Sequence, residues 1–588
     1  MQIELIMKVL CVGFSLLSWE TLSFQFSTRF PKVLNSYSSL QNYKSGVGPI
    51  TITTLKQSQS AVVSDNPIIA SIDEEGIQKL GKTVLVVPYN ADQVTSKFGS
   101  YSPIGSPSVL EAAKLIIKKI SWFSDRKVDA EVVVLPENID KKEEEGGSNT
   151  SRKELENKLH DASAVIALNI AQEHDLNFLT SVFNHRKTGL NENTANWNHC
   201  QFAIDCGAEL PSIAGPYDES SPSFSANLLP WTNDASGKRM VEQMLGLFQR
   251  WTSDDFVVAL MIFFNQYSDG EIDWVKHSID ATYEKGLVQN AREFYDMITK
   301  CGDCVTKCVG DEKCKECLDK LTEVDTRDQV ASYRLIVSYE SELLKDFSYC
   351  ILQKNNIFGC DAKIPTMPKV EPMKNFRGVP LTQEMARKIL VGHLDDSYGF
   401  DDVGKTDISW KVAAGANVAY DQFPSQNQIF YESANKKDMW YDPVFRVETI
   451  DGRNVWCKRH YKVRSAKVPG TFRFSVLDNG VTSNEFWTIV AAADDLSWIV
   501  FHYAGAATSV GQRYLGGLVC TADGTLPPES ARKEIWPKLQ SAGIEPWELF
   551  VCDNRSDTPG AIAAGEPPLD YYRKTILTKQ EAMKIVSK

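Results

Sequence analysis

The sequence has no excess of positive charge, few histidines and, beyond its first residues, no apolar run long enough to cross a bilayer. Its net charge of -13 over 588 residues argues against a nucleic-acid partner, because phosphate binding needs a basic face. The longest such run, residues 256–264, is about half of the ~20 residues that a spanning helix needs. It predicts a buried helix, with a lipid-contacting segment as the alternative. At ~150 residues per domain, the length predicts about three domains.

Acidic residues are absent from residues 24–64, where Ser, Thr and Lys or Arg recur. Ahead of this segment, Lys8 precedes an apolar run at residues 9–17, and Thr21 and Ser23 supply small residues for cleavage before Phe24. A secretory signal followed by an acid-poor segment is similar to the two-part presequence of algae with complex plastids. We therefore predict a plastid-targeting presequence at residues 1–64. An ordinary secretory signal with a disordered N-terminus is the alternative.

Residues 78–246 alternate between strand-like and helix-like segments. Short β-branched runs at 84–87, 132–135 and 164–168 are typical of strands buried on both faces of a parallel sheet. Residues 108–117 and 151–160 predict amphipathic helices between them, so we expect an open α/β domain. It has no G-x-G-x-x-G turn, and no nucleotide is predicted. A structural or docking role is expected here, and residues 141–149 should be an exposed loop. A main activity in this domain is the alternative.

Seven of the 13 cysteines crowd into residues 301–360 of a predicted helical domain at 247–364. The first three share one face of a helix, and the next two return on a second short helix. The short spacing and the lack of a nearby histidine favour disulfides over a metal site, with zinc or free thiols as alternatives and the pairing left open. Disulfides indicate an oxidising compartment. The candidates are Cys301, Cys304, Cys308, Cys314, Cys317, Cys350 and Cys360. The cysteines predicted to be buried thiols are Cys200, Cys206, Cys457, Cys520 and Cys552.

Residues 401–555, after a proline-containing linker at 365–400, are rich in short strand candidates. Turn residues such as Asp451-Gly452 separate them, and about eight strands would close a barrel that suits a small or elongated apolar ligand. The candidates are residues 428–431, 444–448, 461–463, 472–476, 487–491 and 498–503. Residues 530–539 predict a helix capped by Ser530, and 556–588 a C-terminal tail. The predicted fold is therefore multidomain α+β: an open α/β sheet, a helical Cys-rich domain and a C-terminal eight-stranded β-barrel.

Asp421 is set among aromatic and aliphatic residues at the start of this barrel segment. Desolvation penalises the charged form of a carboxyl group, so an acid held in an apolar barrel mouth keeps its proton and can donate it. Asp421 is therefore the candidate general acid. A solvated carboxylate in a turn is the alternative.

The residues around Asp421 resemble those of the violaxanthin de-epoxidases, plastid enzymes that reduce xanthophyll epoxides inside a lipocalin-type barrel. The family pattern G-x-N-x-x-aromatic-D-x-F-x-x-Q follows a first-strand tryptophan, and residues 501–505 and 514–521 resemble its last strands. This chain meets the pattern with Trp410, Gly415, Asn417, Tyr420, Asp421, Phe423 and Gln426. Its length makes it most similar to the longer de-epoxidase-related and de-epoxidase-like proteins of algae with complex plastids.

This resemblance implies reduction of violaxanthin- or diadinoxanthin-type carotenoid epoxides, with ascorbate as co-substrate and without metal or nucleotide. It implies a plastid protein in the thylakoid lumen or associated with the thylakoid lipid surface. Asp421 would be the acid, and Trp410, Gly415 and Asn417 the barrel signature. The implied contacts to substrate or ascorbate, each with core packing as the alternative, are Tyr420, Phe423, Gln426, Tyr503 and Tyr514. Two other functions stay open: an epoxide-to-allene isomerase of the neoxanthin-synthase kind, and a non-catalytic carotenoid carrier.

Overall fold

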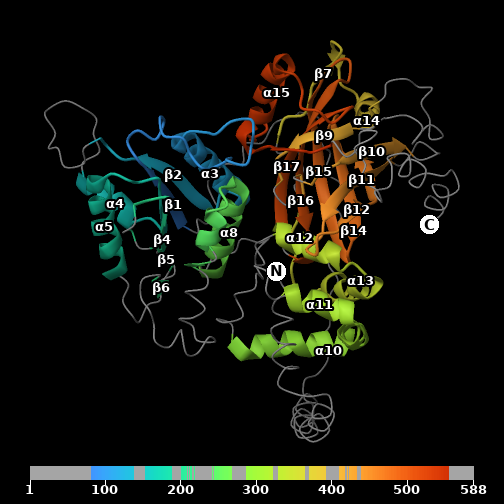
Figure 1. The fold of residues 1–588 in the computed structure, drawn as a ribbon, viewed down its shortest axis with the longest axis horizontal. Coiled ribbons are helices and arrows are strands. Elements are labelled where there is room, and N and C mark those ends of the chain that lie inside the picture. The colour runs from blue at the N-terminus through green and yellow to red at the C-terminus, as the bar shows by residue number, and fades with distance from the viewer. Residues whose placement is uncertain are drawn as a thin grey trace, which may run out of the picture. The chain divides into compact units, whose positions relative to one another are not determined.

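The computed structural model describes residues 81–137, 152–188, 200–207, 210, 212–214, 217–218, 241–242, 244–267, 286–321, 329–364, 370–392, 410–417, 420–421, 423–432, 439–510 and 512–554 (Figure 1). They all belong to one compact unit of the chain. The predicted presequence, the loop at 141–149 and the tail at 556–588 lie outside the described residues.

A parallel sheet forms the core of the predicted α/β region. Its parallel strands β1 (Gly81–Val87), β2 (Val128–Val134), β3 (Ala164–Leu168) and β4 (Cys200–Ile204) lie in the order β2-β1-β3-β4. Two short antiparallel strands, β5 (Ile213–Ala214) and β6 (Tyr217–Asp218), continue the sheet. Every residue of β3 is buried, as the β-branched run predicts.

Helices cover both faces of this sheet and confirm the open α/β architecture (Figure 1). On one face lie α3 (Val109–Phe123) and α8 (Ser253–Tyr267), and on the other α4 (Arg152–His160) and α5 (Glu173–Thr188). Ser108 and Glu111 form a capping box that starts α3. The predicted apolar helix is α8, whose residues 256–261 are buried in the core. Within the described residues, no helix is long and apolar enough to cross a membrane.

The Cys-rich region is helical, as predicted. It comprises α10 (Gly286–Gly310), α11 (Glu312–Leu321), α12 (Gln329–Ser338), α13 (Glu342–Ser348) and a π-helical turn η2 (Tyr349–Lys354). Disulfides join Cys301 to Cys350 and Cys308 to Cys314. The first connects α10 to η2 and the second closes the turn between α10 and α11. Among the described residues, the cysteines in no disulfide include Cys304 and Cys317 of this region and the predicted thiols Cys206, Cys457 and Cys520.

Eight antiparallel strands close the predicted barrel. They are β9 (Trp410–Gly415), β10 (Asn427–Glu432), β11 (Met439–Glu448), β13 (Tyr461–Ser465), β14 (Thr471–Asp478), β15 (Val481–Ala492), β16 (Trp498–Ala507) and β17 (Gln512–Thr521). Each strand pairs with the next, and β9 closes the ring by pairing with both β10 and β17. Two further strands extend the sheet: β12 (Asn454–Lys458) pairs with β11, and β18 (Phe550–Val551) pairs with β9.

The barrel interior is packed with aromatic rings. Trp487 stacks on Phe474 at a centroid distance of 4.7 Å and on Tyr503 at 5.1 Å. The segment predicted as a linker contains the hairpin β7 (Asn375–Phe376) and β8 (Val379–Pro380) and helix α14 (Gln383–Val391), whose apolar face joins this core. The indole N–H of Trp410 donates to the carbonyl oxygens of Ile389 and Leu390 near the end of α14, at 3.2 and 3.1 Å.

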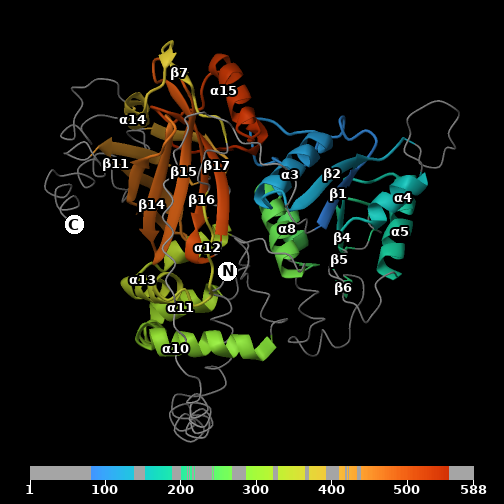
Figure 2. The same ribbon diagram turned by 180° about the vertical axis from the view of Figure 1, so that it is seen from behind.

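Helix α15 (Glu529–Ser541) packs on the outer face of β15 and β16 (Figure 2). The predicted serine cap is wrong. Pro528 is the N-cap residue, and no side chain caps the helix. The ring of Pro528 fixes its φ at -62°, which directs the chain into the helix before Ser530 is reached.

Candidate functional site

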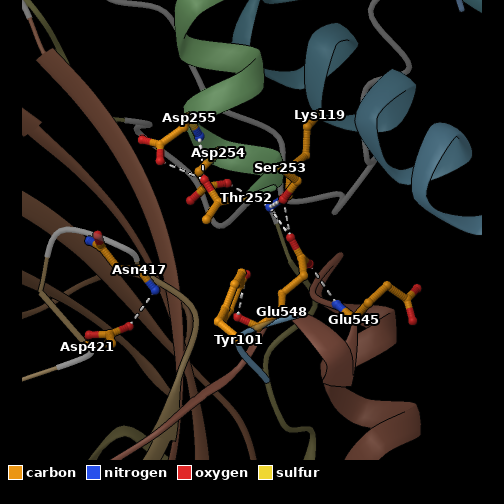
Figure 3. Close-up of polar contacts among 10 residues, drawn as sticks. All are labelled: Tyr101, Lys119, Thr252, Ser253, Asp254, Asp255, Asn417, Asp421, Glu545 and Glu548. Atoms are coloured by element: carbon orange, nitrogen blue, oxygen red, sulfur yellow. Dashed lines mark hydrogen bonds and ion pairs between the residues drawn. The ribbon is translucent and has the colours of Figure 1, made fainter. Parts of the chain in front are cut away.

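Asp421 lies in the loop between β9 and β10, with only 1% of its surface exposed. The backbone N–H of Asn417 donates to its Oδ2 at 2.7 Å (Figure 3), and the Tyr503 hydroxyl on β16 lies 3.1 Å from each carboxyl oxygen. The carboxyl packs directly on Gly415 of β9, where an added Cβ would lie 2.6 Å from Asp421 Cγ. The end of β9 therefore needs glycine at position 415, because a side chain there would displace the Asp421 carboxyl.

Burial raises the pKa of Asp421 to about 8, although the Asn417 N–H and the Tyr503 hydroxyl act to lower it. The nearby Glu485 raises it further, because two negative charges in one apolar interior repel each other. Asp421 is therefore mostly protonated at neutral and mildly acidic pH. Its raised pKa is the property that the apolar sequence neighbours of Asp421 predict for a buried acid.

Glu485 on β15 is a second buried acid that sequence reasoning missed. Its Oε2 accepts from the Trp487 indole N–H at 2.6 Å and its Oε1 from the Tyr514 hydroxyl at 2.7 Å. Burial raises the pKa of Glu485, and these two donors act to lower it. The signal that could have identified Glu485 is its position two residues before Trp487. Residues two apart on a strand face the same side of the sheet, and Trp487 faces the barrel interior. The predicted strand began at residue 487 and so excluded it.

Two glycines provide the space for the two tyrosines. On paired strands β16 and β17, Gly505 lies opposite Tyr514, and Tyr503 opposite Gly516. An added Cβ at Gly516 would lie 2.5 Å from Tyr503 Cε1, and one at Gly505 would lie 2.6 Å from the Tyr514 hydroxyl. The paired glycines therefore let each ring lie flat across the neighbouring strand, with its hydroxyl group beside a carboxyl group.

The other predicted contact residues lie in a separate cluster. Tyr420 and Phe423 pack against Phe445 of β11, at ring distances of 4.6 and 5.7 Å. Gln426 Nε2 donates to the backbone carbonyls of Tyr420 and Phe423 at 2.9 Å each, so it shapes the loop that carries Asp421. Within the described structure, the Tyr420 hydroxyl and Gln426 Oε1 are buried without a hydrogen-bond partner. Only Tyr503 and Tyr514 among these residues contact a buried carboxyl.

Residues 293–554 match the family model of the VDE lipocalin domain. This match begins within α10 and ends just after β18. The solved structures that are similar include lobster apocrustacyanin A1 (11% identity, 24% of this chain and 74% of that chain, TM-score 0.19). They also include odorant-binding protein OBP1 (11%, 25% and 91%, 0.20) and the bovine lipocalin allergen Bos d 2 (7%, 26% and 95%, 0.20). No curated protein matches the sequence.

Proposed function

We propose that this chain is a xanthophyll epoxide-processing enzyme that reduces violaxanthin- or diadinoxanthin-type epoxides with ascorbate. The observation that carries the proposal is the Asp421 carboxyl, buried in the barrel with a pKa of about 8. The match of residues 293–554 to the VDE lipocalin domain supports it. The predicted presequence and the family resemblance support a plastid location, with the thylakoid lipid as the source of pigment.

Asp421 acts on the epoxide oxygen. Its carboxyl proton moves to that oxygen as the C–O bond on the polyene side breaks, because protonation turns the oxygen into a better leaving group. Ascorbate supplies a hydride to the conjugated chain, and loss of the resulting hydroxyl as water leaves a new double bond. In sum, one epoxide, one ascorbate anion and one proton give one alkene, one water and one dehydroascorbate. The solvent then restores the proton of Asp421.

The residues present suit a small polyhydroxylated reductant. Gln426 Oε1 is a buried acceptor and the Tyr420 hydroxyl a buried donor or acceptor, both without a partner in the described part of the chain. A buried polar atom without a partner costs free energy, which a hydroxyl group of a ligand would recover. The two oxygens of Glu485 accept from the side chains of Trp487 and Tyr514, so this second acid acts by holding the Tyr514 ring in place.

The test uses the full chain with its disulfides intact. Violaxanthin and diadinoxanthin in lipid are incubated with it at mildly acidic pH, with and without ascorbate, and the products are separated by chromatography. The same assay is run on Asp421→Asn and on Asp495→Asn, a matched change at an exposed turn. We expect ascorbate-dependent loss of epoxide with the original chain and with Asp495→Asn, and none with Asp421→Asn.

Two outcomes would contradict the reduction. An ascorbate-independent product of unchanged mass would indicate an isomerase that opens the epoxide without hydride transfer. Unchanged pigment that elutes with the protein, including with Asp421→Asn, would indicate a carrier in which the buried acid has no chemical role.

A further inference from the structure

Strand β18 completes the sheet behind the candidate acid. Strand β10 pairs with β9 only at Trp410 and Lys411. Further along the same strand, β18 pairs with β9, placing Phe550 opposite Gly415 and Val551 opposite Ala414. The Asp421 carboxyl packs on Gly415, so the backbone beneath the acid is held by β18 on one side and by β17 on the other.

The α/β domain binds the residue that leads into β18. Glu548, in the 3₁₀ turn η5 (Pro546–Glu548), is bound by the Lys119 ammonium group of α3 and by the Ser253 hydroxyl of α8 (Figure 3). Lys119 also binds Asp254 Oδ1 at 2.7 Å and Ser253 Oγ at 2.8 Å. Burial alone would lower the pKa of Lys119, but the charges of Asp254 and Glu548 raise it. The lysine therefore stays charged at every pH of interest.

A second group of contacts joins the same two regions. The ring of Tyr101 stacks on Phe550 at 4.2 Å with an interplanar angle of 12°, and its hydroxyl donates to the Glu548 carbonyl at 3.3 Å. Gly99, with φ +71°, lies against Trp547, whose carbonyl oxygen would be 2.5 Å from an added Cβ. Through these contacts, residues 547–550 pack against the loop that precedes α3.

We propose that the α/β domain is a positioning element for the barrel site: Lys119 and Tyr101 hold Glu548 and Phe550, and thereby keep β18 on the strand that supports Asp421. This inference rests on the proposed function, because it assigns a role in the action of the same acid. The contacts run without a gap from Lys119 through Glu548 and Phe550 to Gly415. Lys119 and Tyr101 touch no reacting atom and act only through β18.

Release of β18 would let water reach the backbone beneath Asp421. Since burial is the main cause of its raised pKa, that pKa would fall from about 8 toward its usual range. In the described part of the chain, the titratable groups that face Asp421 are those of Tyr503, Glu485, Cys520 and Tyr441, all on barrel strands. A substitution at Lys119 changes none of them directly, so a change in the Asp421 pKa would report on β18.

The test is Lys119→Met in the full chain. Infrared difference spectra against the same protein carrying Asp421→Asn isolate the carboxyl signal of Asp421 and give its titration midpoint without any substrate. We expect the midpoint to fall by about one pH unit or more, because Glu548 loses its buried partner and withdraws toward water. The alkaline limb of the turnover profile should move by the same amount.

Two further variants serve as controls. Asp125→Asn breaks the ion pair with Arg513 Nη1 (2.8 Å), another contact between the α/β region and the barrel, and should leave the midpoint unchanged. Lys119→Met combined with Glu548→Met and Asp254→Asn removes all three charges of this cluster and should restore the midpoint, because neutral groups can replace a buried ion-pair network. General loss of stability would not be reversed in this way.

A folded Lys119→Met protein with an unchanged midpoint would overturn the proposal. If Lys119→Met fails to fold, Tyr101→Leu, which removes the stacking on Phe550, provides the same test and should lower the midpoint by a smaller amount. An unchanged midpoint there would also overturn it. Because the infrared titration needs no pigment, its outcome stands even where the chromatographic assay shows no epoxide reduction.

Discussion

Asp421 should make the barrel less stable as the pH rises, and Asp421→Asn should remove that dependence. The carboxyl pKa is about 8 in the folded chain and about 4 in an unfolded one. Between these values the folded state binds a proton that the unfolded state has released, so the stabilisation is full below about pH 4 and is lost as the pH rises through 8. From pH 5 to 7.5 this group alone lowers the free energy of unfolding by about 3 kcal/mol.

Urea unfolding followed by far-ultraviolet circular dichroism measures this difference. The free energy of unfolding is determined at pH 5 and 7.5 for the original chain, for Asp421→Asn and for the exposed control Asp495→Asn. Asparagine cannot titrate, but its side-chain oxygen still accepts from the Asn417 N–H. Glu485, whose pKa is also raised, contributes in the same direction to all three proteins, so the difference measures the Asp421 carboxyl together with its coupling to Glu485. Equal pH dependence in the original chain and Asp421→Asn would refute the buried acid.

Three further substitutions test the fold around the site. Gly415→Ala should lower the free energy of unfolding by roughly 1–3 kcal/mol, because the new methyl group overlaps the candidate acid. The control Gly302→Ala, where nothing lies within 4 Å of an added Cβ, should not destabilise the protein. Equal melting temperatures for the two variants would contradict this. Replacing Cys301 and Cys350 by serine should lower the free energy of unfolding by about 4 kcal/mol, because the disulfide closes a loop with a sequence separation of 49. An unchanged urea midpoint would show that the disulfide does not contribute to stability. Trp410→Phe should lower the free energy of unfolding by about 1 kcal/mol, because the indole hydrogen bond to α14 is lost. Urea unfolding should show a lower midpoint at an unchanged slope. A midpoint equal to that of the original chain would rule this hydrogen bond out as a source of stability.

Local patterns predict the architecture well and the site only in part. The β-branched runs of the α/β domain predict its buried strands, because a strand covered on both faces must be apolar along its length. Asp421 is predicted from its apolar neighbours. The pairing of Lys119 with Glu548 is not, because the two residues are 429 positions apart and no local periodicity records such a contact. Glu485 is not predicted as a buried acid, because a single charged residue at the start of a strand usually faces solvent.

The aromatic residues of the barrel also show that local sequence does not predict which side chains contact the acid. Both Tyr503 and Tyr420 are predicted contacts in the barrel, but of their two hydroxyl groups it is that of Tyr503 that contacts the Asp421 carboxyl. Which ring faces the acid depends on strand register, and the register here places Gly516 opposite Tyr503 and Gly505 opposite Tyr514. Helix α15 shows how one residue overrides a capping preference, since the fixed φ of Pro528 starts the helix ahead of Ser530.

The position of β18 in the chain sets the order in which the parts of the site are synthesised. A ribosome makes the α/β domain first and residues 550–551 after every strand of the eight-membered ring. The strands of the ring are therefore made before the strand that supports the acid, and Glu548 pairs with a lysine that was synthesised 429 residues earlier. A chain that stops short of η5 would possess the ring and Asp421 but lack the water barrier behind Gly415. The proposed barrier to water behind Asp421 is therefore complete only once residues 550–551 have been added to the chain and pair with β9.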